Sequence, residues 1–226
     1  MQKIKVSTKE ELRKIIEKSP IDADLNHLDV SGITDMSDLF VLTQFNGDIS
    51  DWDVSNVENM QGLFFLSRFK GDISKWNVSK VKNMSRIFAN SRFNGDISNW
   101  DVSSVEDMSF AFSNSIFYGD LSRWNVSNVK TMEGMFAGSI FNGDISKWDV
   151  SNVRNMKNMF ANSKFDNDIS DWDVSNVEDV SGMFDNAIFE GDTSKWNLKN
   201  VKNDTNMYLI SRDGQVANLN PKELGL

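Results

Sequence analysis

Eight aspartates recur at a fixed spacing and are the first residues to consider for chemistry: Asp24, Asp48, Asp72, Asp96, Asp120, Asp144, Asp168 and Asp192. If the units that carry them stack, their carboxylates form a file roughly 5 Å apart. Such a file either binds cations or has each carboxylate accept hydrogen bonds from nearby backbone N–H groups. Calcium needs about six or more oxygen ligands, and only one oxygen-rich position in each turn is regular. The spacing therefore favours turn capping, and we expect no metal site.

The other candidates for catalysis are weak. The chain has one histidine, His27, and no cysteine, which excludes thiolate chemistry and cysteine-ligated zinc. The recurrent serines, from Ser31 to Ser175, have no recurrent histidine to act as a base, and His27 falls at an outward position. No Walker or dinucleotide-binding glycine motif is present. We therefore expect no enzyme activity, no catalytic residue and no cofactor.

The seven tryptophans show the same period of 24 residues: Trp52, Trp76, Trp100, Trp124, Trp148, Trp172 and Trp196. A fixed period of this size is typical of stacked repeats, in which each unit buries its apolar face against its neighbours. The pattern extends back to Ile21. It divides the chain into an N-terminal cap at 1–20, eight repeats at 21–208 whose first and last units are degenerate, and a C-terminal cap or tail at 209–226.

Two hydrophobic periods alternate within each unit. In residues 49–55, apolar Trp52 and Val54 alternate with polar residues, which predicts a strand with Trp52 pointing inward. From Val57 onward, apolar residues recur three to four positions apart, the spacing of a helical turn. We therefore expect an α/β repeat with a parallel sheet on one face and short helical turns on the other. An outward tryptophan column that stacks on sugars is the alternative.

The unit Ile49-x-x-Trp52-x-Val54 followed by Val57-x-x-Met60-x-x-Leu63-Phe64 resembles a leucine-rich repeat with Trp and Val in leucine positions. The whole unit resembles the BspA-like leucine-rich-repeat surface proteins of bacteria, including those of mycoplasmas. The resemblance covers residues 21–208 and implies a right-handed solenoid that serves as a surface adhesin or binding protein. It favours the cell surface, but we find no signal peptide and no lipobox cysteine, so the cytoplasm is the alternative location.

The two ends of the stack need caps. Residues 7–19 predict a helix with a capping box, formed by Ser7 with Glu10 or by Thr8 with Glu11, and a stop at Pro20. Its apolar stripe of Leu12, Ile15 and Ile16 is expected to cover the first unit. The last unit loses the pattern, so a homodimer through the C-terminal edge is a further hypothesis.

The charge pattern bears on partners. The 24 basic and 33 acidic residues give a net charge of −9, which argues against nucleic acid as a partner. No apolar run is long enough to span a membrane. The outward column Glu58, Lys82, Glu106, Lys130, Arg154, Glu178 and Lys202 alternates in sign, so neighbouring units are expected to attract each other. We expect a protein partner, bound through the strand face.

One irregularity marks the candidate binding centre. The alternation fails where Arg123 is followed one unit later by Lys147, and Lys130 by Arg154. One unit earlier, Phe110 and Tyr118 replace residues that are polar, charged or glycine elsewhere. Aromatic residues and arginines are enriched in binding hot spots, although drift between repeats is an alternative cause. Two other functions also stay open, namely an intracellular regulatory or immunity-type binder and a cation-dependent glycan-binding module.

Overall fold

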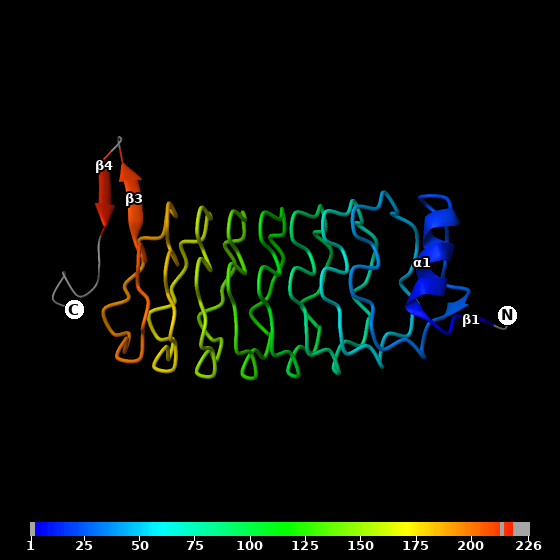
Figure 1. Ribbon diagram of the computed structural model, residues 1–226, viewed down its shortest axis with the longest axis horizontal. Coiled ribbons are helices and arrows are strands. Elements are labelled where there is room, and N and C mark those ends of the chain that lie inside the picture. Colours follow the sequence, from blue (N-terminus) through cyan, green and yellow to red (C-terminus); the bar gives the residue numbers. More distant parts are fainter. Residues whose placement is uncertain (1–2, 213–214, 219–226) are drawn as a thin grey trace.

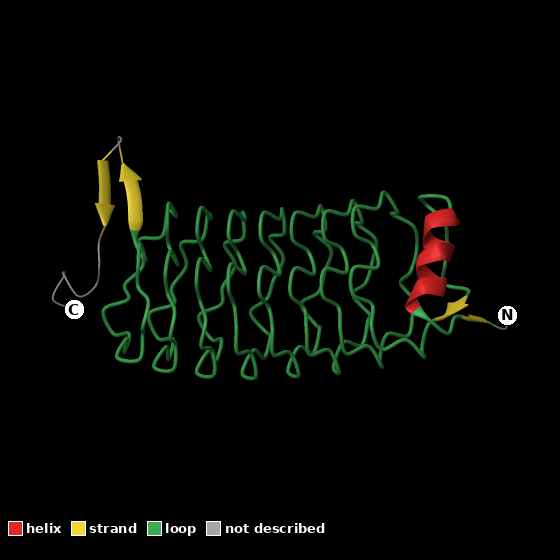
Figure 2. Cartoon of the chain, in the orientation of Figure 1, coloured by secondary structure: helices red, strands yellow, loops and turns green. Residues whose placement is uncertain are grey.

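The chain forms an elongated stack of similar rungs, and the computed structural model describes residues 3–212 and 215–218 (Figure 1). In chain order the elements are β1 (Ile4–Lys5), α1 (Lys9–Lys18), β2 (Leu28–Asp29), β3 (Leu209–Arg212) and β4 (Gln215–Asn218). The chain advances along the long axis, with α1 at one end and the β3–β4 hairpin at the other. Apart from β2, the rungs between them are loops and turns (Figure 2).

β-Bridges between rungs recur in one column, with a further bridge between Asp24 and Asp48. At the N-terminal end β1 pairs in parallel with β2, with Ile4 opposite Leu28, and at the C-terminal end β3 pairs antiparallel with β4. The rungs are joined by isolated parallel bridges through Asp35, Asn59, Asn83, Asp107, Thr131, Asn155, Asp179 and Asn203. The parallel pairing that we expected along the tryptophan column therefore lies a few residues further on, at the Asn59 column.

Residues 49–55 differ from the predicted strand because the backbone turns twice. The N–H of Trp52 donates to the carbonyl of Ile49 at 3.2 Å, and the N–H of Val57 donates to the carbonyl of Val54 at 2.9 Å. Such contacts between residues three apart are those of β-turns. Trp52 and Val54 still point inward and Asp51 and Asp53 outward, so the sidedness was predicted correctly while the backbone conformation was not.

Residues 61–66 also form turns, and no helix lies within the described rungs. Gly62 and Leu66 have φ angles of 59° and 56°, in the left-handed region that interrupts an α-helix. The N–H groups of Met60, Gly62, Phe64 and Leu66 donate at 2.8–3.0 Å to carbonyls of the next rung, those of Asn83, Ser85, Ile87 and Ala89. The three-to-four spacing of apolar residues thus reflects successive turns that bond to the neighbouring rung. The right-handed leucine-rich-repeat solenoid stays a prediction.

Aromatic side chains fill the core in continuous ladders. Phe64 lies 5.2 Å from Phe40 and 5.7 Å from Phe88, measured between ring centroids. A second column runs beside it, with Phe69 and Phe93 6.4 Å apart. These rings are fully buried, and burying one phenylalanine contributes about 1.5–3 kcal/mol. Each rung therefore draws its stability from the rungs on both sides.

The N-terminal helix forms within the predicted residues 7–19. Thr8 is the N-cap and its side chain accepts a hydrogen bond from the Glu11 N–H at 3.1 Å. The Glu11 carboxylate accepts from the Ser7 N–H at 2.9 Å, so the Thr8–Glu11 alternative is the correct one. Leu12 and Ile16 are buried and Ile15 is half-buried, as the predicted stripe requires.

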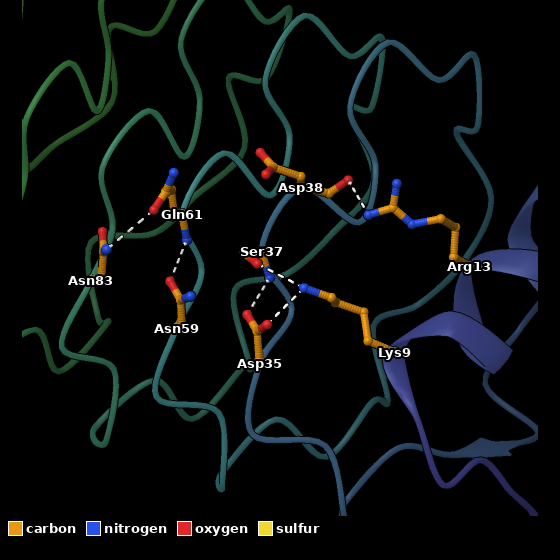
Figure 3. A network of polar contacts seen from close by, with 8 residues as sticks. All are labelled: Lys9, Arg13, Asp35, Ser37, Asp38, Asn59, Gln61 and Asn83. Atoms are coloured by element: carbon orange, nitrogen blue, oxygen red, sulfur yellow. Dashed lines mark hydrogen bonds and ion pairs between the residues drawn. The ribbon is translucent and has the colours of Figure 1, made fainter.

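Polar contacts fix α1 on the first rung (Figure 3). The Lys9 ammonium lies 2.6 Å from the Asp35 carboxylate and 2.8 Å from the Ser37 hydroxyl. Arg13 donates to the carbonyl of Asp38 at 3.1 Å. Burial opposes ionisation of Asp35, but the hydrogen bonds from Lys9 and Ser37 outweigh it and lower its pKa. The helix therefore seals this end of the stack through both apolar and charged contacts.

The last rung continues the core although its sequence departs from the pattern. Tyr208 stacks on Phe184 with 5.0 Å between centroids, and its hydroxyl hydrogen-bonds to the Thr193 hydroxyl. Of the predicted tail at 209–226, β3 and β4 form a hairpin. Residues 213–214 and 219–226 lie outside the described residues. A homodimer through this edge stays a prediction.

Candidate functional site

The aspartate column caps turns, which confirms the prediction. Asp48 Oδ1 accepts a hydrogen bond from the Ser50 N–H at 2.9 Å, and Asp96 does the same for Ser98 at 2.9 Å. The same contact recurs at Asp24, Asp72, Asp120, Asp144, Asp168 and Asp192. Hydrogen bonds from backbone N–H groups favour the ionised carboxylate. They lower the pKa of seven members of the column below 3.8: Asp48, Asp72, Asp96, Asp120, Asp144, Asp168 and Asp192.

The tryptophan column points inward, which confirms the prediction that Trp52 and its equivalents lie in the core. The seven side chains are buried, with exposures of 3–7%, so they offer no outward platform for a sugar. Each indole N–H donates to a carbonyl of the preceding rung, as Trp76 does to Ile49 at 3.1 Å and Trp148 to Leu121 at 3.0 Å. The column therefore joins neighbouring rungs by hydrogen bonds as well as by packing.

Asparagine side chains join the rungs at positions that we did not single out from the sequence. Asn152 Nδ2 donates to the Ser127 carbonyl at 2.8 Å, and Asn176 Nδ2 donates to the Ser151 carbonyl at 2.8 Å. The same contact recurs at Asn56, Asn128 and Asn200. The recurrence of asparagine 24 residues apart, interrupted only by Lys80 and Ser104, is the sequence signal that points to this role.

The alternating charge column forms ion pairs between rungs, as predicted. Lys82 Nζ lies 2.8 Å from the Glu58 carboxylate. At the break in the pattern, Lys130 pairs with Glu106 on one side, and Arg154 lies 3.2 Å from Glu178 on the other. The two candidate cations therefore pair away from each other. Hydrogen bonds from the neighbouring cations lower the pKa of the three glutamates Glu58, Glu106 and Glu178.

Arg123 and Lys147 are exposed on adjacent rungs. Within the described part of the chain neither forms an ion pair. Both cations also affect the aspartate column. Hydrogen bonds from Ser122 are the main cause of the lowered pKa of Asp120, and the positive charge of Arg123 lowers it further. Lys147 adds in the same way to the lowering at Asp144. These two cations are consequently the members of the predicted centre with charge available to a partner.

Phe110 has a packing role within the stack. Its backbone is left-handed, with φ of 57°, and the ring lies against Gly134 of the next rung, where an added Cβ would be 2.4 Å from Phe110 Cε1. The Arg86 guanidinium lies 5.6 Å from the ring centroid on the preceding rung, a cation–π contact. The off-pattern aromatic therefore covers a neighbouring glycine and is half-buried.

Tyr118 has the opposite environment, because its side chain is 69% exposed. Its backbone N–H is held by the Asn94 side chain at 3.0 Å. Ile116 on the same rung and Ile140 on the next rung are also exposed. Of the two off-pattern aromatics, the structure thus leaves Tyr118 on the surface beside other apolar side chains.

Two overlapping stretches, residues 10–117 and 114–218, match the model of the family described as Mycoplasma protein of unknown function, DUF285. The chain belongs to this family. No curated protein and no solved structure matches it. In the part of this DUF285 chain that the structure describes, no helix is long and apolar enough to cross a membrane. The described residues also contain no group of three or more His, Cys, Asp or Glu able to hold a metal ion.

Proposed function

We propose that this DUF285 chain is a non-enzymatic scaffold that binds a protein partner through its strand face. We keep the name strand face from the sequence-based prediction for the outward surface of two columns of turn and loop residues, one from Asp51 through Arg123 and Lys147 to Lys195, the other from Glu58 to Lys202. The observation that supports this role is that some polar residues bond within the stack while others point outward without such bonds. Aspartates and asparagines that recur in the rungs bond within the stack. The column of Arg123 and Lys147 changes from rung to rung, and these two residues form no ion pair with a described residue.

The centre of the proposed surface is the pair Arg123 and Lys147. Each is exposed, and neither forms an ion pair with a described acidic residue. Unpaired cations fixed on a rigid support attract an acidic partner and raise its association rate. Lys130 and Arg154 retain their ion pairs on the same stack, so we assign them the smaller part in binding.

A finer proposal concerns relatives and location. Membership in a Mycoplasma family is consistent with the BspA-like leucine-rich-repeat surface proteins that the sequence resembles. We propose adhesion at the cell surface as the setting in which the scaffold works. Fractionation of native mycoplasma cells tests this location, and recovery of the protein in the cytoplasm alone would favour the regulatory or immunity-type binder instead.

Charge reversal tests the binding role. The double variant Arg123→Glu and Lys147→Glu should lose partners that the unaltered chain retains in a quantitative pull-down from mycoplasma cells. Lys164→Glu, which alters an exposed lysine outside the strand face, is the matched control and should retain them. The melting temperature should stay nearly unchanged in both variants because these side chains are exposed. Equal recovery of every partner by the double variant and the control would contradict the proposed centre.

A further inference from the structure

A second outward surface runs along residues 42–46 and the equivalent residues of later units, which surround the phenylalanine column of Phe69 and Phe93. At residues 114–118, Ser115 and Phe117 are buried while Asn114, Ile116 and Tyr118 are exposed. The first of these positions ends the left-handed turn, and the other two alternate along the segment that follows, so three positions of each rung lie toward this surface. We name this surface the return face. It comprises Leu42, Gln44, Asn46, Leu66, Arg68, Lys70, Asn90, Arg92, Asn94, Asn114, Ile116, Tyr118, Gly138, Ile140, Asn142, Asn162, Lys164, Asp166, Asn186, Ile188 and Glu190.

Exposed apolar side chains gather on the return face. Among the described residues eight large hydrophobic side chains are exposed, and six of them lie here: Leu42, Leu66, Ile116, Tyr118, Ile140 and Ile188. Single exposed apolar residues are ordinary on a protein surface, but contiguous ones mark interaction sites. Ile116, Tyr118 and Ile140 are contiguous because they occupy neighbouring positions on two adjacent rungs. Leu42 and Leu66 form a second contiguous pair on two earlier rungs.

Leucine at positions 42 and 66 is unfavourable for the stability of the fold for two reasons. Their φ angles are 58° and 56°, a region that suits asparagine and glycine and disfavours a branched side chain. The equivalent positions on the next rungs are Asn90, Asn114 and Gly138. Leu42 is 66% exposed and Leu66 is 40% exposed, so burial does not compensate for the backbone conformation. A strained backbone with an exposed apolar side chain points to a role outside folding.

Three cations lie between these two apolar groups. Arg68, Lys70 and Arg92 are exposed on the second and third rungs of the return face. No acidic residue lies on the return face from Leu42 to Asn142, although the whole chain has a net charge of −9. The described ion pairs include none of the three cations. The net charge of these positions is therefore positive, opposite in sign to that of the molecule, and the exposed aspartate column (Asp48, Asp72 and Asp96) borders them two residues further along the chain.

We propose that the return face from Leu42 to Ile140 binds an acidic segment of a partner protein whose apolar residues flank the acidic ones. Rungs roughly 5 Å apart place Leu66 and Ile116 on the order of 10 Å from each other. An extended ligand covers that distance in about three or four residues, which leaves room for acidic side chains opposite Arg68 and Arg92. Tyrosine and arginine are enriched among the few residues that carry most of the binding energy in protein interfaces. The inference goes beyond the strand-face proposal because it uses neither Arg123 nor Lys147.

An anionic membrane is the other kind of surface that cations and apolar side chains can meet. Lipid recognition usually uses clusters of about four to eight cations, whereas this part of the return face has three. Rows of uncharged polar residues, such as Asn90, Asn94 and Asn114, separate the apolar groups. These amides suit hydrogen bonds to a peptide better than insertion among acyl chains, and the observations therefore favour a protein segment.

Selection from a random peptide library displayed on phage tests the proposal with the whole chain as target. We expect enriched peptides to carry Asp or Glu between apolar residues. A synthetic copy of the best peptide should bind at least about tenfold more weakly to the triple variant Ile116→Ser, Tyr118→Ser, Ile140→Ser and to the double variant Arg68→Glu, Arg92→Glu. Ile188→Ser is the matched control, because Ile188 is 50% exposed in the column of Ile140 but two rungs away, and it should bind normally.

Three results would overturn the inference: no enrichment, enriched peptides without acidic residues, or equal binding by the triple variant and the control. Stronger loss of binding to phosphatidylserine vesicles than to the peptide would assign the face to a membrane. The variant Arg123→Glu, Lys147→Glu separates the two proposals, because it should keep the peptide. If the variant Arg123→Glu, Lys147→Glu no longer binds the peptide while the return-face variants still bind it, the strand-face proposal holds and the return-face proposal fails. Unchanged melting temperatures establish that each variant is folded.

Discussion

The interior of the stack and its return face arise from the same 24-residue unit yet differ in how far they vary. One core position is phenylalanine in every unit from Phe40 to Phe184 and tyrosine at Tyr208. The return-face column that contains Arg68 also contains glutamine, isoleucine and lysine. A core ring contacts its equivalents on both neighbouring rungs, so two neighbours constrain its shape. No described side-chain hydrogen bond, ion pair or ring contact constrains the Arg68 column in this way, and its variation is free to serve recognition.

The two off-pattern aromatics of one unit make the same point. Phe110 lies between Arg86 and Gly134 and is half-buried, whereas Tyr118 is 69% exposed. Both depart from the repeat by residue type. Phe110 packs against a glycine of the next rung, whereas Tyr118 remains on the surface. The comparison therefore separates aromatics that complete the stack from aromatics available to a partner.

The largest test of this contrast removes one aromatic from each region. Phe136→Ala should lower the free energy of unfolding by about 3–5 kcal/mol, because it opens a cavity in the ladder between Phe112 and Phe160. Tyr118→Ala should change it by no more than about 0.5 kcal/mol. Urea denaturation followed by circular dichroism measures both values. Similar losses in the two variants would mean that the return face contributes to the core.

A second test concerns glycines. Gly134→Ala should destabilise by about 1–3 kcal/mol, because Gly134 has φ of 57° and a Cβ there would lie 2.4 Å from the Phe110 ring. Gly32→Ala, where no atom lies within 4 Å of the added Cβ, should be neutral or stabilise by up to about 1 kcal/mol. Thermal unfolding compares the two. If Phe110 causes the clash, adding Phe110→Ala to Gly134→Ala should cost less than the sum of the single changes.

A third test uses pH and the aspartate column. The folded-state pKa of these carboxylates is below 3.8 because serine N–H groups bond to the ionised form. Their contribution to stability is therefore present above the unfolded value of 3.8 and is lost as pH falls through the lower folded values. The triple variant Asp96→Asn, Asp120→Asn, Asp144→Asn keeps a side-chain oxygen as acceptor but cannot titrate there. Below about pH 4 its unfolding free energy should fall less steeply than that of the unaltered chain, and equal slopes would refute the assignment.

The smallest expected effect is that of calcium. Because each column carboxylate already accepts a serine N–H, we expect millimolar calcium to leave the melting temperature unchanged. Magnesium at the same ionic strength is the control for screening of surface charge. A calcium-specific rise in melting temperature would show that the column binds cations, and would revive the cation-dependent glycan-binding alternative.

Much of the interior could be predicted from the sequence, because a strict repeat places equivalent residues beside each other. The inward Trp52 column, the capping role of Asp48 and the pairing of Lys82 with Glu58 all follow from that rule and are confirmed. The capping helix followed from its own local signals. The backbone of the rung did not, because inward and outward alternation at Trp52 and Val54 fits both a strand and a pair of turns.

The candidate site was harder to predict because it depends on contacts between rungs at variable positions. Arg123 and Lys147 remain candidates, whereas Phe110 has a packing role that only the position of Gly134 reveals. The return face was missed, since its residues are two apart along the chain and 24 apart between rungs. Its alternating exposure becomes visible only when the turns at 61–66 are known to end in an extended segment.

The sequence by itself determined the number of units, the columns and which side chains face inward, because period and polarity are properties of residue order. The tertiary structure decided where the rungs pair, how left-handed residues replace a helix and which outward columns form one surface. These features depend on hydrogen bonds and packing between residues 23 to 27 positions apart. A backbone N–H can meet either a carbonyl of its own turn or one of the next rung, and only the assembled stack selects between them.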